Sequence, residues 1–464
     1  MKYILIILSF GLFLFAPTGY SIPFCIACAA VYLYMAFLTL KKEITNKTYF
    51  SFNLLFWISM FCTTFIVPLF VLPTGFRYTL DFYANKGTSM VVFSMSLYYA
   101  GWISAYHKSR QYDRMSCCSI RVNKTVVRVL SVFSLLVTFL YIYQYAIFLR
   151  TSTAYDNDIG LGFTYTLIQS ILCSALVVSS VYNKNSGIRS LSSFITNNSI
   201  LLGCYAIIIV TSVFIGDRTM PIYLALCILG CYVFFIKRIR FITQWGLILV
   251  AAAVMVTIGK TRTTDSSFRE GGLGSIGSTT VETISSAETA VELFSDFMPA
   301  TSALYACIDW RASNNNKLFY PLKIFKIPFS PLPYVPTLMA RGMFGVENSE
   351  LSSASLTTHH FSERVMDISG GLGTHAVGDI YVSWGIIGIF FFFYMFGIVL
   401  GTSQRRLYEN IYWSLTYFAL LSNALYIPRA SILDNYRAIV FELFFVWLAG
   451  RISGKSIVNK DKAE

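Results

Sequence analysis

Charged side chains are scarce in this chain. Asp, Glu, Lys and Arg make up only 13% of its 464 residues, whereas hydrophobic residues make up 55%, and the mean hydropathy is +0.60. A soluble domain carries about a quarter charged residues, so water is excluded as the solvent for most of the chain. The basic residues lie between apolar runs rather than in one patch, which argues against nucleic-acid binding despite a formal net charge of +13.

Several common enzyme motifs are missing as well. The chain contains no P-loop, no G-x-G-x-x-G following a predicted strand, no G-x-S-x-G and no H-E-x-x-H. These patterns mark nucleotide-binding loops, dinucleotide-binding folds, serine hydrolases and zinc proteases. The sequence therefore carries no signature of these four classes.

The cysteines do not form a disulfide framework. Nine of the ten fall in apolar runs or in the inner loop at Cys117 and Cys118, and only Cys307 falls in the large outer loop. Cys25 and Cys28 have C-x-x-C spacing, but they lie inside an apolar run, which favours packing over a redox or metal site. We therefore expect no bound metal.

Long apolar runs dominate what is present. A helix needs roughly 20 apolar residues to cross the hydrocarbon core of a membrane. Runs that qualify, or nearly so, lie at about 4–20, 22–40, 49–72, 87–106, 125–148, 163–182, 199–216, 219–236, 243–259, 380–402, 411–427 and 434–450. The first is interpreted as a span rather than a signal peptide, because no small-x-small cleavage site follows and a second run begins almost at once.

These runs predict an all-α fold, a bundle of about twelve transmembrane helices. We expect the first nine helices in residues 1–259, one large loop in residues 260–379, and the last three helices with a short tail in residues 380–464.

Basic residues fix the expected orientation of the bundle. With the N-terminus inside, the inner loops hold clusters of Lys and Arg and the opposite short loops hold single charges, as the positive-inside rule requires. The inner clusters are Lys41, Lys42 and Lys47; Lys108, Arg110, Arg114, Arg121, Lys124 and Arg128; Lys184 and Arg189; Lys237, Arg238 and Arg240; Arg405 and Arg406; and the tail after Arg451. We predict that both termini are cytoplasmic and that the large loop faces outward.

The large loop has three recognisable parts. A glycine- and serine-rich stretch near Glu270–Ser278 precedes an amphipathic helix, Val281–Met298, which Pro299 is expected to end or kink. The segment Phe319–Phe344 then carries five prolines among large apolar residues. We expect it to lie along the membrane–water interface, held by its aromatic side chains. Such a loop suits a substrate whose lipid tail stays in the bilayer while its polar head lies at the span ends.

Arginines at the outer span ends are candidates for binding an anionic head group. Arg218 lies in a short turn between two spans, Arg262 follows the next outward-going span, and Arg429 lies in the turn between the last two spans. Arginine binds phosphate oxygens bidentately and does not lose its charge. The alternative is that each arginine snorkels to lipid head groups or pairs with a nearby aspartate.

Three of the four histidines gather near the end of the large loop. His375 follows a glycine-rich stretch and directly precedes a span, so we assign it as the candidate base, with Asp379 one helical turn later to orient it. His360, Arg364, Asp379 and Arg429 complete the expected substrate-binding set. The alternative is that these are surface residues of a flexible loop.

Together these features resemble the Wzy-type O-antigen polymerases and the related O-antigen ligases. The shared features are the many spans, the Gly-x-Arg turn at Gly216–Arg218, the arginine after the following span, and a long outer loop closing on Gly-Leu-Gly-Thr-His-Ala-Val-Gly-Asp-Ile-Tyr-Val-Ser-Trp-Gly-Ile-Ile-Gly. The topology is similar over nearly the whole chain. The sequence similarity is confined to about residues 214–222, 258–263, 370–390 and 427–437.

The resemblance implies a metal-independent glycosyltransferase of the GT-C type in the bacterial inner membrane, with no cofactor. Its substrate would be an oligosaccharide repeat unit on undecaprenyl pyrophosphate, with membrane lipids around it and with a flippase and a chain-length regulator of the same pathway as partners. Arg218 and Arg262 match the arginines thought to hold the pyrophosphate. His375 matches the candidate base of the ligases, where many polymerases have no histidine.

Two other functions stay open. A ligase would transfer the same glycan to lipid A core instead of to another repeat unit. A flippase for lipid-linked sugars would show two related halves and charged residues lining a cavity within the spans. In this chain the charges gather at one face, and the long loop interrupts one side only, which favours the polymerase.

Overall fold

The computed structural model describes most of the chain. The described residues are 2–45, 50–75, 80–106, 120–151, 158–215, 217, 219–237, 239, 243, 246, 298–364, 372–454 and 458–459. Within them the fold is helical apart from one antiparallel pair of two-residue strands, β1 (Ile120–Arg121) and β2 (Val458–Asn459). The predicted all-α class is confirmed.

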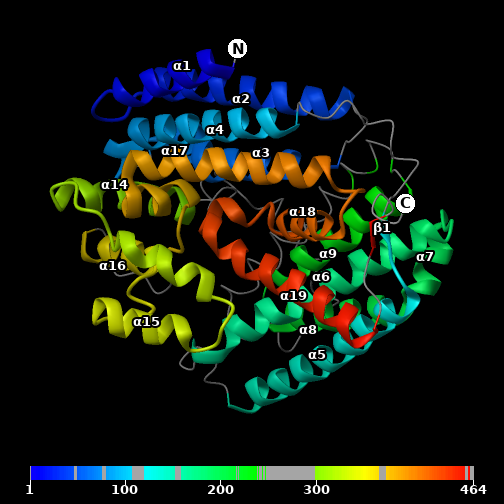
Figure 1. Ribbon diagram of the computed structural model, residues 1–464. Helices are drawn as coiled ribbons and strands as arrows, with labels where there is room; N and C mark the ends of the chain where they lie inside the picture. Colours follow the sequence, from blue (N-terminus) through cyan, green and yellow to red (C-terminus); the bar gives the residue numbers. More distant parts are fainter. Residues whose placement is uncertain are drawn as a thin grey trace.

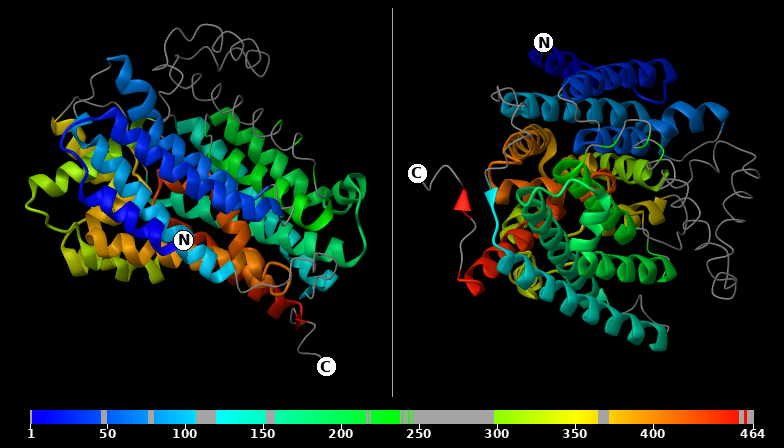
Figure 2. Two further views of the ribbon diagram at one scale, coloured as in Figure 1. Left: turned by 90° about the horizontal axis from the view of Figure 1, so that it is seen from above. Right: turned by 90° about the vertical axis from the view of Figure 1, so that its right-hand side faces the viewer.

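Long helices lie side by side and form the body of the molecule (Figures 1 and 2). They are α1 (Lys2–Leu14), α2 (Ile22–Thr45), α3 (Phe52–Ile66), α4 (Ala84–Tyr106), α5 (Lys124–Thr151), α6 (Asp158–Asn185), α8 (Ser199–Ile215), α9 (Thr219–Cys231), α17 (Ala376–Arg405), α18 (Ile411–Asn423) and α19 (Asn435–Ile452). Helices α1 and α2 cover one side, α5 covers the opposite side, and α3, α17 and α18 lie between them.

Shorter elements extend or connect these helices. A π-turn, η1 (Val67–Val71), and a 3₁₀ turn, η2 (Leu72–Thr74), continue α3, and η5 (Tyr232–Ile236) continues α9. The others are η3 (Asp81–Tyr83), α7 (Leu191–Asn197), α14 (Met298–Ser313), η7 (Pro321–Phe329), α15 (Val335–Phe344), α16 (Ser353–Arg364), η8 (Ile427–Arg429) and η9 (Ile432–Asp434). We call the end of the bundle that holds α14, α15 and α16 the loop end; β1, α7 and the C-terminus lie at the opposite end (Figure 1).

The protein is a multi-pass membrane protein by the length and composition of its helices, but the predicted count of twelve spans is not confirmed. Among the described residues, six helical stretches are long and apolar enough to cross a membrane, and the bent pair α7 and α8 would add a seventh. Helices occupy every predicted span except 243–259, which lies outside the described residues apart from positions 243 and 246. Some are too short: α18 has 13 residues, about 20 Å at 1.5 Å per residue, whereas the hydrocarbon core is about 30 Å thick.

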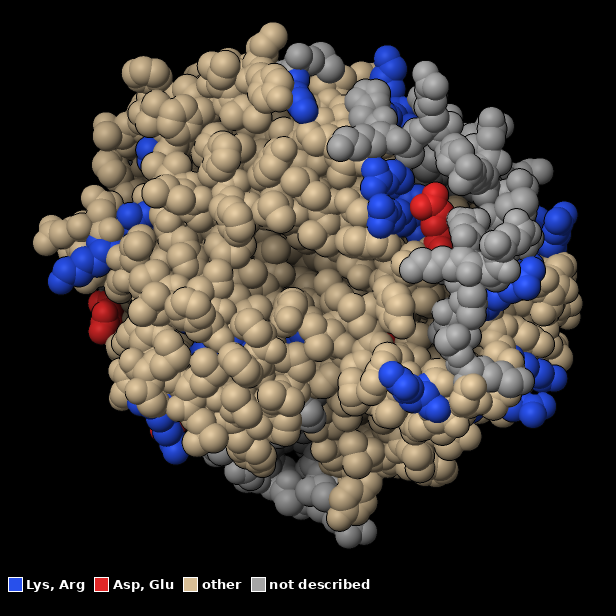
Figure 3. Space-filling model, in the orientation of Figure 1, with Lys and Arg blue, Asp and Glu red and all other residues tan. Residues whose placement is uncertain are grey.

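The surface is compatible with insertion in a membrane. Figure 3 shows a broad, nearly uncharged area in the middle of one face, with Lys and Arg near the two ends of the helices. Large apolar side chains are exposed on the helices, among them Ile387 and Phe390 of α17. Which end faces the cytoplasm stays a prediction.

Glycines let α4 and α17 approach each other closely. A Cβ atom on Gly101 of α4 would lie 2.1 Å from the carbonyl oxygen of Tyr394, and one on Gly397 of α17 would lie 2.2 Å from that of Tyr98. Gly401 follows Gly397 at the four-residue spacing that lets membrane helices touch, backbone against backbone. This contact fixes the position of α17, whose N-terminus enters the loop end.

A buried polar network reinforces the same helices towards their opposite end. Glu43 of α2 accepts hydrogen bonds from the hydroxyl of Ser51 at 2.5 Å and from the amides of Asn53 at 2.6 Å and Gln404 at 2.7 Å. Trp102 of α4 donates to Gln404 at 3.0 Å. Burial of a carboxyl group is tolerated only when it is hydrogen-bonded in this way, so the network ties α2, α3, α4 and α17 into one unit.

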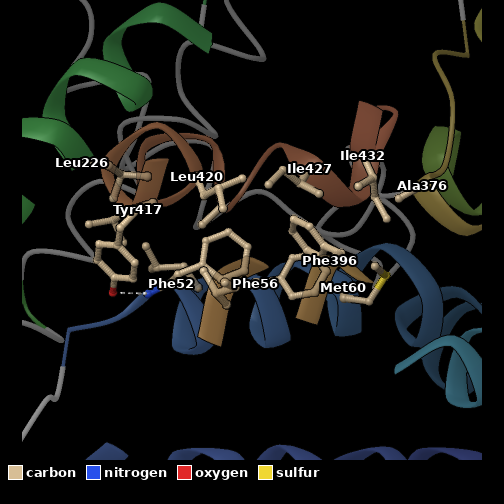
Figure 4. Close-up of a cluster of buried hydrophobic side chains, with 14 of the residues drawn as sticks. Phe52, Phe56, Met60, Leu226, Ala376, Phe396, Tyr417, Leu420, Ile427 and Ile432 are labelled. Atoms are coloured by element: carbon tan, nitrogen blue, oxygen red, sulfur yellow. Dashed lines mark hydrogen bonds between the residues drawn. The ribbon is translucent and has the colours of Figure 1, made fainter. Parts of the chain in front are cut away.

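The apolar core between α3, α17 and α18 is rich in aromatic side chains (Figure 4). Phe52 and Phe56 of α3 pack against Phe396 of α17, with ring centroids 5.9 and 5.7 Å apart. Tyr417 of α18 accepts a hydrogen bond from the backbone N–H of Phe52 at 3.3 Å. Aromatic pairs with this edge-to-face geometry add to the free energy of burial.

Helix α14 belongs to the region predicted as a loop, yet it is buried in the bundle from Ala300 to Asp309. The hydroxyl of Thr301 donates to the carbonyl of Thr63 in α3 at 2.7 Å. The predicted helix Val281–Met298 lies outside the described residues except for Met298. Helix α14 is described from Met298 onward and includes Pro299, so the predicted end or kink at Pro299 is not tested, because the residues before Met298 lie outside the described part of the chain.

Replacement of Gly397 by alanine should separate α4 from α17. The added methyl group would overlap backbone atoms that cannot rotate away, and we expect a loss of about 1–3 kcal/mol of stability. Gly203→Ala is the matched control, because a Cβ on Gly203 in α8 meets nothing within 4 Å. Thermal unfolding in detergent micelles measures both variants, and equal melting temperatures for the two would contradict this account of the contact.

Candidate functional site

The predicted site residues fall into two groups. Arg218 and Arg262 lie outside the described residues, so the predicted pyrophosphate-binding pair is not tested. Arg364 is the last residue of α16, and its side chain is also outside the description. The structure places His360, His375, Asp379 and Arg429 at the loop end.

His375 caps the first turn of α17. Its backbone is extended, and its Nδ1 accepts a hydrogen bond from the backbone N–H of Val377 at 3.2 Å. The proton of the neutral ring therefore sits on Nε2, which lies 3.3 Å from the hydroxyl oxygen of Thr64. Burial lowers the pKa of His375 to about 3, so the ring stays neutral. Both ring nitrogens are engaged, which leaves neither available to take a proton from a substrate.

The contact with Thr64 is made where α3 loses its regular geometry. Pro68 lacks the N–H that would bond to the carbonyl of Thr64 four residues earlier, and α3 gives way to the π-turn η1 at Val67. The carbonyl of Pro68 in turn accepts a hydrogen bond from the hydroxyl of Tyr20 at 2.6 Å. Helix breaks of this kind are common at functional sites.

Asp379 does not orient His375 as expected. Its backbone N–H bonds to the carbonyl of His375 at 2.8 Å, but its carboxylate accepts from the ammonium of Lys323 at 3.3 Å and from the hydroxyl of Ser431 at 2.5 Å. Asp379 and Lys323 are both buried. An ion pair needs such additional hydrogen bonds to offset the cost of removing two charges from water.

Lys323 fastens η7 to α17. Its ammonium lies 5.5 Å from the ring centroid of Trp384, and the indole N–H of Trp384 donates to the carbonyl of Pro321 at 2.8 Å. The backbone N–H of Phe319 donates to the carbonyl of Val382 at 2.9 Å. The start of the predicted interfacial segment is therefore held against α17 by one ion pair and two hydrogen bonds.

The remainder of that segment exposes large apolar side chains. Leu322, Phe325 and Phe329 of η7 are 54%, 54% and 43% exposed, and Leu338 of α15 is 66% exposed. Exposed apolar residues grouped in this way mark a surface that contacts lipid or another protein. Their position next to the ends of the membrane-capable helices is what the predicted interfacial role requires.

Residues 372–375 form a short extended segment that contacts α16 and η8 and leads to His375. Gly373 has a φ of +72°, which lets the chain turn so that its carbonyl accepts from the hydroxyl of Thr357 in α16 at 2.6 Å. A Cβ on Gly373 would lie 3.9 Å from the carbonyl oxygen of Arg429. The segment thus passes between α16 and η8 before it reaches His375.

Sequence reasoning missed a second buried pair of polar side chains. His360 of α16 lies with Nε2 2.7 Å from Oδ2 of Asp309 in α14, and the hydroxyl of Tyr83 donates to Oδ1 at 2.9 Å. Asp309 could have been noticed because it is an acid in an otherwise apolar helical segment, where a carboxylate needs a partner. Lys323 was missed because nothing in the sequence relates it to Asp379.

The loop end therefore contains the buried pair Asp379–Lys323, the buried pair Asp309–His360 and Arg429. The apolar side chains of η7 and α15 are exposed at the same end. Among the described residues no group of His, Cys, Asp and Glu has the arrangement of a metal site. Figure 3 shows a hollow near the middle of the face that lies between α17 and α19.

No protein-family model matches the chain, and neither curated proteins nor solved structures show a significant similarity to it.

The lowered pKa of His375 predicts a specific sensitivity to acid. In the unfolded chain the ring takes up a proton near pH 6.5, whereas the folded site resists protonation down to about pH 3. Stability is therefore lost as the pH falls through this window, by about 2 kcal/mol at pH 5. Thermal unfolding in micelles at pH 7.5 and pH 5 should show a smaller loss for His375→Asn, which keeps a capping side chain, than for the wild type. Exposed His359→Asn should behave as the wild type; the same loss in all three would refute the assignment.

The Asp379–Lys323 pair predicts strong coupling between two substitutions. Asp379→Asn leaves a buried ammonium without its counter-charge, which costs about 3–5 kcal/mol. The double variant Asp379→Asn, Lys323→Gln removes both charges and should regain a large part of that loss. A double-mutant cycle on melting temperatures measures the coupling, and additive effects would show that the two charges do not stabilise each other.

Proposed function

We propose that the protein polymerises oligosaccharide repeat units carried on undecaprenyl pyrophosphate, at the periplasmic face of the bacterial inner membrane. The growing chain moves from its lipid carrier to the terminal sugar of an incoming unit, and undecaprenyl pyrophosphate is released. The observation that carries the proposal is the juxtaposition, at the loop end, of buried ionisable side chains with an exposed apolar surface on η7 and α15.

This juxtaposition fits the two parts of a lipid-linked sugar. The exposed apolar side chains of η7 and α15 suit the membrane interface, where the isoprenoid tail leaves the bilayer. Arg429, at the end of η8 beside Gly373, brings a permanent positive charge to the same end. Arginine suits a pyrophosphate because its planar guanidinium binds two oxygens at once.

The reaction requires stabilisation of the leaving group and removal of one proton. The acceptor hydroxyl oxygen bonds to the anomeric carbon of the donor, the bond from that carbon to the pyrophosphate oxygen breaks, and the pyrophosphate keeps the electron pair. Positive groups placed around the pyrophosphate would lower the barrier, which is often the largest catalytic contribution. Arg218 and Arg262 are proposed for this role from the family resemblance, together with Arg429.

The buried acids inside the helices support a polymerase over a flippase. A transporter places ionisable residues in a cavity within the spans. Glu43 bonds instead to neutral neighbours, including Ser51 and Asn53, and Glu442 of α19 accepts from the hydroxyl of Tyr223 at 3.1 Å. These contacts serve helix packing. A ligase performs the same chemistry with lipid A core as the acceptor.

The polysaccharide profile of a strain lacking this gene tests the proposal. Loss of a polymerase leaves lipid A core that bears one repeat unit, because ligation still proceeds. Core that bears no repeat unit would reject the polymerase and indicate the ligase or the flippase. Full-length polysaccharide in this strain would reject all three.

Complementation with variants tests the arginines. Arg218→Ala, Arg262→Ala and Arg429→Ala should each insert in the membrane but reduce chain growth by about 10²-fold or more, as expected when charge stabilisation of a leaving group is lost. Arg451→Ala at the opposite end of the bundle is the control and should restore normal chains. Normal chain lengths from all three variants would show that the pyrophosphate binds elsewhere.

A further inference from the structure

Asp309, His360 and Tyr83 form a hydrogen-bonded group drawn from three separate elements. The residues lie in α14, α16 and η3, and the side chains of Asp309 and His360 are only 4% and 11% exposed. The neighbouring residue His359 is different: its side chain is 78% exposed and pairs with exposed Glu363 at 3.4 Å. Of these two adjacent histidines, His360 therefore has a buried carboxylate partner and His359 does not.

The contact with Asp309 determines the tautomer of His360. An ionised carboxylate can only accept, so Nε2 of the neutral ring carries the proton and Nδ1 carries the lone pair. Nδ1 has no hydrogen-bond partner among the described residues. It is also not one of the fully buried polar atoms without a partner. The lone pair therefore reaches the surface of the site.

His360 lies on the face of α16 that contacts the segment of residues 372–375. Thr357, one helical turn before His360, donates to the carbonyl of Gly373, and Ser353, one turn earlier, is bonded to Thr374 at 2.9 Å. The same face of α16 thus follows residues 373–374 towards His360. A substrate held against that segment can approach His360, whereas His375 is closed off by Val377 and Thr64.

We propose that His360, oriented by Asp309 and Tyr83, is the general base for the acceptor sugar, and that His375 only positions the first turn of α17. This inference rests on the proposed function. As the acceptor oxygen bonds to the anomeric carbon, its proton moves to Nδ1 of His360 and the pyrophosphate leaves with the electron pair. The carboxylate of Asp309 stabilises the imidazolium that forms, and the base contributes on the order of 10²–10⁴-fold to the rate.

The test uses purified full-length protein in nanodiscs, with lipid-linked repeat units extracted from the deletion strain. His360→Ala should lower kcat by about 10²-fold or more with little change in KM, and added imidazole should restore part of the rate. Asp309→Asn should lower kcat similarly, because an amide can donate to Nε2 and select the wrong tautomer. His359→Ala is the matched control and should keep the wild-type rate. His375→Asn should not respond to imidazole.

A second measurement separates catalysis from a purely structural contact. Nuclear magnetic resonance of ¹⁵N-histidine-labelled protein, which has only four histidines, should show the Nε2–H tautomer for His360 and its loss in Asp309→Asn. Wild-type kcat in His360→Ala, or a loss that imidazole never restores together with lowered thermal stability, would overturn the role of His360 as a base. Wild-type protein that elongates no repeat unit at all would instead reject the proposed polymerase.

Discussion

The arrangement of the loop end depends on the backbone contact between α4 and α17. Lipid removes the hydrophobic drive that joins helices in water, so the two helices are held by close van der Waals packing at Gly101 and Gly397 and by the hydrogen bond that Trp102 of α4 donates to Gln404 of α17. Helix α17 bends at Gly385, whose backbone angles are not helical. Before this bend, Gly378 lies against Cys307 and Leu304 of α14, so α4 and α14 together fix where the first turn of α17 enters the loop end. The backbone positions of His375, which caps this turn, and of Asp379 within it are therefore fixed.

The polar contacts at the loop end follow from that fixed start. Asp379 pairs with Lys323 and thereby holds η7 against α17, while the segment before His375 holds α16 through Thr357. The ion pair joins residues 56 positions apart in the sequence and is buried. Ion pairs are stronger in such surroundings than in water. These contacts therefore hold the exposed apolar face of η7 and α15 next to the membrane-capable helices.

The sequence predicted the helical class well and the site only in part. Apolar runs report helices because a span must be apolar over its whole length, but short helices such as α18 and polar ones such as α4 cannot be separated from true spans by that pattern. His375 was identified as important from its place before a span, yet its role as a base depended on a free nitrogen that the capping bond to Val377 removes. The pairs Lys323–Asp379 and Asp309–His360 are 56 and 51 residues apart in sequence, and no local pattern relates such partners.

The two histidines of the loop end show why residue type alone does not assign a role. His375 has complete burial, a lowered pKa and two occupied nitrogens, which suit a neutral side chain that joins α17 to α3. His360 has one nitrogen held by a carboxylate and the other open, which is the arrangement that allows a proton to be accepted and the resulting charge to be stabilised. A base must change its protonation state in each turnover, so the histidine with a counter-ion and an open lone pair suits that task, whereas the fully enclosed histidine suits the task of holding the helix that carries it.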